Sequence, residues 1–233
     1  MVFLCVAKLF FLSFFFCIHF LSASERPILI FRPQTPQEAF SYIEKLYPQL
    51  PWFKENGYQV ALPEHPIFAI LQQNPRALSD AERPELEELF VTEVYSASQY
   101  DCSLRNLKEW GPLITQGLEK LAALKENWGF NLMETYEVVL TLYGPGGDCD
   151  PQKGTVLLFT TPSGGFKRSA GYEVLLHEIV HIGIEEPIVR KYNLSYWETE
   201  RLVDLICSQY LNDILFFPVT KHSKEEIGIL TTS

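Results

Sequence analysis

The first pattern along the chain is an apolar, almost uncharged run that precedes every other element. It extends from Phe10 to Phe20, the small residues Ser22-Ala23-Ser24 follow it, and Lys8 is the only charge among residues 1–24. This arrangement is typical of a secretory signal peptide. We therefore expect residues 1–24 to be removed and the mature protein to be secreted or periplasmic. A retained leader would instead anchor the chain to a membrane.

Helical spacing of apolar positions dominates residues 25–135. It predicts helices over about 36–47, from an N-cap at Ser79 to about Ser96, and over about 104–125. Pro112 is expected to kink or divide the last of these helices. Repeated prolines before residue 78 interrupt regular structure. We expect a mainly helical N-terminal region, which could serve as a substrate-cleft wall, an inhibitory prosegment or a docking surface.

The pattern changes to strands and then helices over residues 136–233. Residues 137–143 and 155–160 are short runs rich in β-branched and apolar side chains, and a glycine-rich loop separates them. A helix is expected after the loop at 162–165, ending near Gly183 and Pro187, and a second helix should begin at Asn193 or Ser195. These elements predict an α+β fold in which a small mixed sheet packs on a helix.

The first of those two helices carries His177-Glu178-Ile179-Val180-His181. Two histidines at i and i+4 project from one helical face, where neutral imidazoles can share one tetrahedral Zn²⁺ ion. Glu178 lies close enough to that face to act as a general base on a metal-bound water. The pattern therefore predicts a zinc-dependent hydrolase.

A third ligand is expected from the following helix, where two glutamates compete. Ser195 and Glu198 fit a capping box, which would give Glu198 a structural role. Glu200 shares its helical face with apolar residues and Cys207, and a carboxylate on such a stripe needs a partner. We therefore predict His177, His181 and Glu200 as zinc ligands. Asp204, one turn after Glu200, is expected to accept a hydrogen bond from a ligand imidazole.

With these ligands the chain resembles the gluzincin metallopeptidases. The His-Glu-x-x-His motif followed by Glu200 after eighteen residues matches the spacing of aminopeptidase N-like enzymes, and Glu200-x-x-x-Asp204 is similar to the third-ligand segment of thermolysin-like enzymes. The resemblance covers about residues 154–216 and implies a zincin-like catalytic region, here residues 136–233. The chain lacks the Gly-Ala-Met-Glu-Asn segment of the aminopeptidases. Ile184 and Pro187 stand at the positions where metzincins have glycine and histidine.

The resemblance implies hydrolysis of peptide bonds by a zinc-bound water, with Glu178 as general base. The oxyanion would need a hydrogen-bond donor, for which Tyr192, Tyr196 and His222 are candidates. Because the strand before the active-site helix forms the sheet edge in gluzincins, residues 155–160 are expected to dock a peptide or protein substrate. A zinc hydrolase of a non-peptide amide and a catalytically silent binding protein on the same scaffold remain alternatives.

Composition and charge limit the kinds of partner that the protein is expected to bind. The formal net charge is −10, and no basic stripe interleaved with aromatic residues is evident, so nucleic acid is an improbable partner. Three cysteines follow the leader, at positions 102, 149 and 207. In an oxidising compartment one pair could form a disulfide, for which we favour Cys102 and Cys149.

Overall fold

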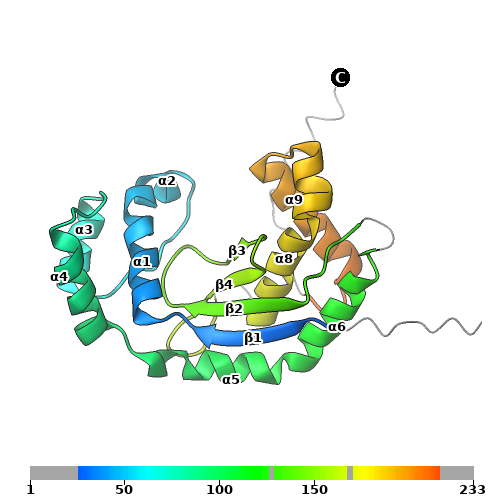
Figure 1. Ribbon diagram of the computed structural model, residues 1–233, viewed down its shortest axis with the longest axis horizontal. Coiled ribbons are helices and arrows are strands. Elements are labelled where there is room, and N and C mark those ends of the chain that lie inside the picture. The colour runs from blue at the N-terminus through cyan, green and yellow to red at the C-terminus, as the bar shows by residue number, and fades with distance from the viewer. Residues whose placement is uncertain (1–25, 126–128, 167–169, 216–233) are drawn as a thin grey trace, which may run out of the picture.

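A mixed four-stranded sheet lies at the centre of the molecule (Figure 1). The computed structural model describes residues 26–125, 129–166 and 170–215. The sheet order is β1-β2-β4-β3, with β1 (Ile28–Pro33), β2 (Thr135–Thr141) and β4 (Thr155–Phe159) parallel and β3 (Asp148–Asp150) antiparallel to β4. The expected α+β class is confirmed.

Helices gather at the two ends of the sheet (Figure 1). At one end are α1 (Pro36–Leu46), α2 (Leu50–Glu55), α3 (Pro66–Gln73) and α4 (Glu82–Leu89). At the other are α6 (Gly111–Ala122) and α9 (Tyr196–Tyr210). The helix α8 (Gly171–Ile184) lies against one face of the sheet, and α5 (Asp101–Glu109) runs below it. Short 3-10 or π-helical segments extend these elements at Tyr47–Gln49, Phe90–Val94, Ala97–Tyr100 and Glu185–Arg190.

The helices expected in the N-terminal region are present. Thr35 and Glu38 form a capping box that starts α1. Ser79 exchanges hydrogen bonds with Glu82, the first residue of α4, but the N-cap of this helix is Ala81, so the predicted N-cap at Ser79 is wrong by two residues. The predicted division of the third helix is confirmed, because α5 ends at Glu109 and α6 starts at Gly111 with a proline in its first turn.

Two strands were not expected, and one of them corrects the predicted docking strand. β1 is a short apolar run between prolines, too short to show a period, and it pairs with β2. β3 lies in the expected glycine-rich loop and pairs with β4. Since β4 has β2 on its other side, residues 155–159 are an internal strand. The expectation that residues 155–160 form the sheet edge is therefore wrong.

One face of the sheet packs on α8 and α6. Alternate residues of β2 and β4, such as Val138 and Val156, are buried against Leu175 and Ile179 of α8 and Leu118 of α6. Each such large aliphatic side chain contributes about 1.5–3 kcal/mol of hydrophobic stabilisation when it is fully buried. Residues 25–135 thus supply a strand and a helix to the same sheet and core as the segment that carries the motif.

A second cluster of buried residues lies among the helices at the other end. Phe40 of α1, Phe68 of α3 and Phe90 beyond α4 form ring contacts there, and Tyr143 after β2 joins them. None of the described helices is both long and apolar enough to cross a membrane. The predicted signal peptide, residues 1–24, and His222 lie outside the residues that the structure describes.

Candidate metal centre

The helix α8 buries its polar motif among apolar side chains. Its first turn is closed by the Glu173 carboxylate, which accepts a hydrogen bond from the Ala170 amide at 3.1 Å. Glycines let neighbours approach closely: the Phe130 ring occupies the space where a Cβ of Gly183 would stand. Glu178 and most residues of the helix are buried. Polar groups in this setting need partners, because burying them unpaired is costly.

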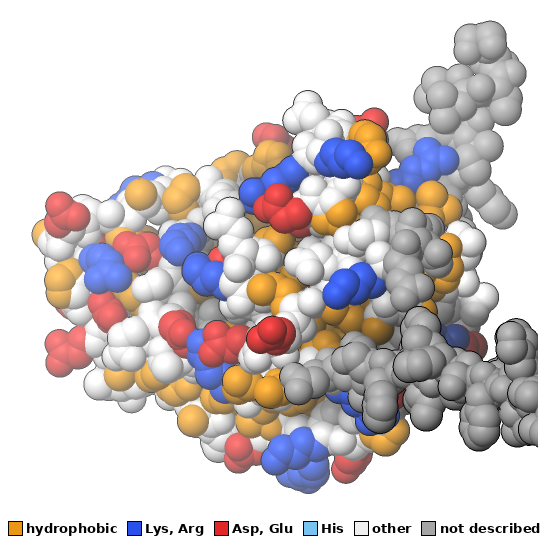
Figure 2. All heavy atoms as spheres, turned by 45° about the vertical axis from the view of Figure 1, so that its right-hand side comes forward, with side chains coloured by type: hydrophobic (Ala, Val, Ile, Leu, Met, Phe, Trp, Pro, Cys, Tyr) orange, Lys and Arg blue, Asp and Glu red, His pale blue; other side chains and the backbone are white. Residues whose placement is uncertain are grey.

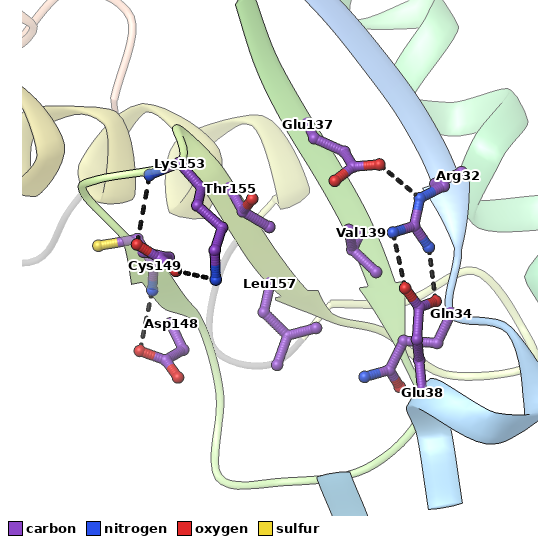
Figure 3. Close-up of a pocket in the computed structure, with 11 residues that line it drawn as sticks. Arg32, Gln34, Glu38, Glu137, Val139, Asp148, Cys149, Lys153, Thr155 and Leu157 are labelled. Carbon is purple, nitrogen blue, oxygen red and sulfur yellow. Dashed lines mark hydrogen bonds and ion pairs between the residues drawn. The ribbon is translucent and has the colours of Figure 1, made fainter. Parts of the chain in front are cut away.

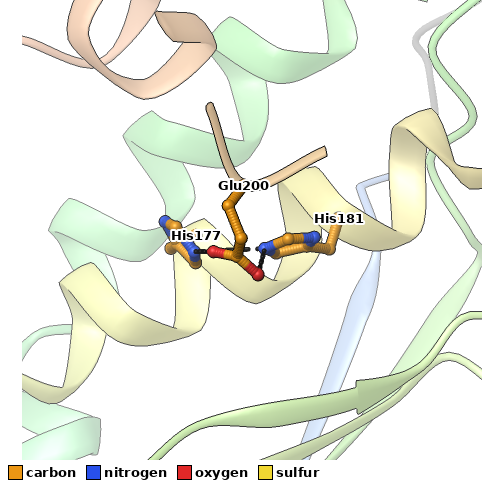
Figure 4. A group of neighbouring side chains, drawn as sticks. All are labelled: His177, His181 and Glu200. Carbon is orange, nitrogen blue, oxygen red and sulfur yellow. Dashed lines mark hydrogen bonds and ion pairs between the residues drawn. The ribbon is translucent and has the colours of Figure 1, made fainter. Parts of the chain in front are cut away.

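The helix α9 begins as the sequence predicts. The Ser195 hydroxyl accepts from the Glu198 amide at 3.4 Å, and the Glu198 carboxylate accepts from the Ser195 amide at 2.8 Å and from its hydroxyl at 2.6 Å. This capping box occupies Glu198 at the start of the helix. Glu200 points instead toward α8, where it lies between the two histidines (Figure 4).

His177, His181 and Glu200 converge on one point (Figure 4). The two Nε2 atoms are 3.2 Å apart, and oxygens of Glu200 lie 3.8 Å from Nε2 of His177 and 3.5 Å from Nε2 of His181. Atoms about 2.0–2.1 Å from a tetrahedral zinc ion lie about 3.4 Å from one another. The two carboxylate distances are to different oxygens, Oε2 for His177 and Oε1 for His181. With one ligand atom taken from each residue, the three atoms lie within 4.8 Å of one another, so they could hold one metal ion. This is the one such cluster among the described residues.

The ionisable groups of this cluster shift one another's pKa values. Burial alone would raise the pKa of Glu200, but hydrogen bonds and charge from His177 and His181 together outweigh it and lower the pKa to about 2. Burial alone would lower the pKa of His177, but hydrogen bonds with Cys207 and Glu200, and nearby negative charge, raise it to about 10. The metal-free site therefore holds a protonated imidazole against a carboxylate, and a metal ion bound by both groups would take the place of that proton.

The Glu178 carboxylate lies against Gly147 and Cys149, at β3. Burial raises the pKa of its carboxyl group, and the charges of His177 and His181 oppose that shift. Its carboxylate stands against Gly147, where an added Cβ would lie 2.5 Å from Oε1. The absence of a side chain at Gly147 is thus what lets this loop close over the carboxylate. Glu178 lies beside the metal cluster without belonging to it, as the sequence predicts.

The other predicted residues lie at different distances from the cluster. Asp204 approaches Nδ1 of His177 to 4.0 Å, which is longer than a direct hydrogen bond. The Tyr196 hydroxyl lies 3.4 Å from that of Tyr58. Although 54% of Tyr196 is exposed, partial burial together with hydrogen bonds to Tyr58 and Glu200 raises its pKa. The exposed ring of Tyr192 packs against the Lys191 ammonium.

Three contacts escaped the sequence-based interpretation. Cys207 lies on the predicted face of α9 but also hydrogen-bonds to His177. Cys149 of β3 contacts Glu178, and Tyr58 reaches Tyr196 from the N-terminal region. Cys102, Cys149 and Cys207 are all free thiols, so the expected Cys102–Cys149 disulfide is wrong: Cys102 lies against Gly164, on a different part of the fold.

A separate hollow of about 350 Å³ lies on the other face of the sheet (Figure 3). Glu137, Val139, Thr155 and Leu157 line it, and they alternate with the residues that face α8. Its charged groups are largely paired, since Arg32 binds Glu38 and Glu137 and Lys153 binds Asp150. The metal cluster, whose donor atoms converge, is therefore the better candidate for chemistry.

Comparisons of the chain with protein-family models, with curated proteins and with solved structures gave no match.

Proposed function

We propose that the chain is an exported, zinc-dependent metallopeptidase with a zincin-like catalytic region. The observation that carries the proposal is the convergence of His177, His181 and Glu200, whose ligand atoms lie within 4.8 Å of one another, with the buried carboxylate of Glu178 beside them. Two imidazoles and one carboxylate are a ligand set typical of catalytic zinc, which leaves a fourth position for water or substrate.

Zinc bound there would supply Lewis acidity, polarising a substrate carbonyl and lowering the pKa of a water molecule. Glu178 would accept the proton of the attacking water and deliver it to the leaving amine. Its burial favours this role, because a carboxyl pKa shifted toward neutrality makes a stronger base. Tyr196, whose hydroxyl adjoins Glu200, is the described residue best placed to donate a hydrogen bond to the developing oxyanion.

We assign substrate docking to β3 rather than to β4. The sheet has two edges, β1 and β3, and β3 is the edge that contacts α8. An extended peptide can add to such an edge through backbone hydrogen bonds. Gly147 and Cys149, at this edge, adjoin Glu178, so a peptide docked there would pass next to the proposed general base.

The proposal that the protein is exported rests on residues 1–24 alone. The apolar run and the small residues after it motivate cleavage near Glu25. Intact mass of protein recovered from the medium or the periplasm should show the shortened chain. Full-length protein in the membrane fraction would favour an anchor instead.

The test of function is a digest of a mixed peptide library by the zinc-loaded wild type and the Glu178→Gln variant. Because Glu178 is not a ligand, the variant should keep zinc and fold while cleaving at least about a hundredfold more slowly. A wild type that cleaves amides but no peptide would indicate another hydrolase. A wild type that binds zinc and hydrolyses neither would indicate a silent binding scaffold. Equal cleavage by both proteins would remove Glu178 from the mechanism.

A further inference from the structure

A residue of the N-terminal region reaches the metal centre from outside the motif. The hydroxyl of Tyr58 lies 3.4 Å from that of Tyr196, although the two are far apart in the sequence. Tyr196 precedes Glu200 by one helical turn, so both side chains lie on the same face of α9. A chain of contacts thus runs from Tyr58 through Tyr196 to the proposed third ligand.

Either hydroxyl group can be the donor in the contact between Tyr58 and Tyr196, because each tyrosine carries one hydroxyl proton and two acceptor lone pairs. In both arrangements the contact fixes the Tyr196 oxygen on the face of α9 that carries Glu200. A hydroxyl oxygen that is held in place needs only to rotate its proton to donate to a substrate oxygen.

Tyr58 is held firmly enough to act in this way. It follows a tight turn at Gly57, whose φ of 75° suits glycine, and its amide donates to the Phe53 carbonyl at 2.8 Å. Its ring stacks on Trp52 with centroids 5.9 Å apart. Ala61, a few residues on, exchanges two backbone hydrogen bonds with Gly144, the start of the loop that leads to β3.

We propose that Tyr58 is a positioning residue, which holds the hydroxyl oxygen of Tyr196 where that hydroxyl can donate to the substrate carbonyl at the metal centre. This inference rests on the proposed function. At 3.4 Å the contact is long for two hydroxyl groups, so its effect should be modest, about 2–10-fold on kcat. This positioning role belongs to the hydroxyl of Tyr58. Support of the fold belongs to its stacked ring, which would remain if the hydroxyl were removed.

The test uses Tyr58→Phe, which removes the hydroxyl and keeps the ring, with Tyr192→Phe as matched control. Tyr192 is exposed and packs against Lys191. In protein labelled with ¹³C at the tyrosine ring carbon that bears the hydroxyl, the Tyr196 resonance is identified by its loss in Tyr196→Phe. Tyr58→Phe should shift that resonance in both metal-free and zinc-loaded protein, and Tyr192→Phe should not.

Kinetics completes the test. Tyr58→Phe should lower kcat about 2–10-fold with little change in KM or zinc content, and it should have no further effect in the Tyr196→Phe background. An unshifted Tyr196 resonance, or an equal loss of kcat in that background, would overturn the inference. If the wild type cleaves nothing, the proposed function and the positioning role both fall, while the resonance still decides whether the two hydroxyl groups are coupled.

Discussion

At the scale of single residues, local rules separated the two candidate glutamates correctly. A capping box needs only a serine and a glutamate three residues later, and the side of a helix follows from its period, so Glu198 and Glu200 could be told apart from sequence. The contact of Tyr58 with Tyr196 could not be foreseen, because it depends on how a distant loop folds against α9. The sequence contains no local signal for such a pair.

The coupling of His177 with Glu200 predicts how metal binding depends on pH. Since the pKa of His177 is raised to about 10 in the metal-free site, zinc must displace its proton at pH 7. Calorimetry in buffers of different ionisation enthalpy should therefore show release of about one proton per zinc, with affinity rising as pH increases toward 10. Binding at pH 7 without proton release would contradict this protonation state.

The same coupling affects the stability of the metal-free protein. A raised histidine pKa contributes stability that is complete below its ordinary value of 6.5 and is lost as pH rises through about 10. The lowered pKa of Glu200 contributes stability that is complete above 4.5 and is lost as pH falls through about 2. The metal-free wild type should thus exceed Glu200→Gln in stability most clearly between about pH 4.5 and 6.5, as urea unfolding would measure.

At the scale of elements, strong periodicity was informative and short strands were not. The helices of the N-terminal region and the strands β2 and β4 carry long apolar patterns. β3 has only the residues Asp148-Cys149-Asp150, with no apolar alternation, and becomes a strand because β4 offers it a pairing edge. Because β3, and not β4, forms this edge of the sheet, we assign substrate docking to β3.

Close packing of α8 predicts the effect of a small substitution. The Phe130 ring fills the space beside Gly183, so Gly183→Ala should destabilise the fold by about 1–3 kcal/mol through overpacking. Gly111→Ala is the matched control, because nothing lies within 4 Å of a Cβ at that helical position. Chemical denaturation measures both variants. An unchanged stability of Gly183→Ala would show that Phe130 moves aside freely.

At the scale of the whole molecule, the N-terminal region is part of the fold that carries the metal cluster. β1 pairs along β2, and α6 packs against α8 so closely that Leu176 meets the backbone at Gly117. A removable inhibitory prosegment would not contribute a strand and a helix to the same core. Of the roles that the sequence left open, we therefore propose a wall beside the candidate metal centre, where Tyr58 contacts Tyr196.

Truncation tests this integration. A chain that begins at residue 135 would lose β1 and α6 and expose the apolar residues of β2 and α8 that they cover. We expect it to be unfolded or aggregated by circular dichroism and size-exclusion chromatography, with or without zinc. A truncated chain that folds and binds zinc would show that the part from residue 135 onward is an independent unit and would contradict this integration.

The whole account depends on one metal ion held by three side chains, and metal analysis tests it most directly. Elemental analysis of purified, zinc-equilibrated protein should give one zinc per chain for the wild type and for Glu198→Ala, whose carboxylate only caps α9. Glu200→Ala and His181→Ala should lose most of the metal. Retention of zinc in Glu200→Ala, with loss in Glu198→Ala, would contradict the assigned centre, and a metal-free wild type would contradict the proposed function itself.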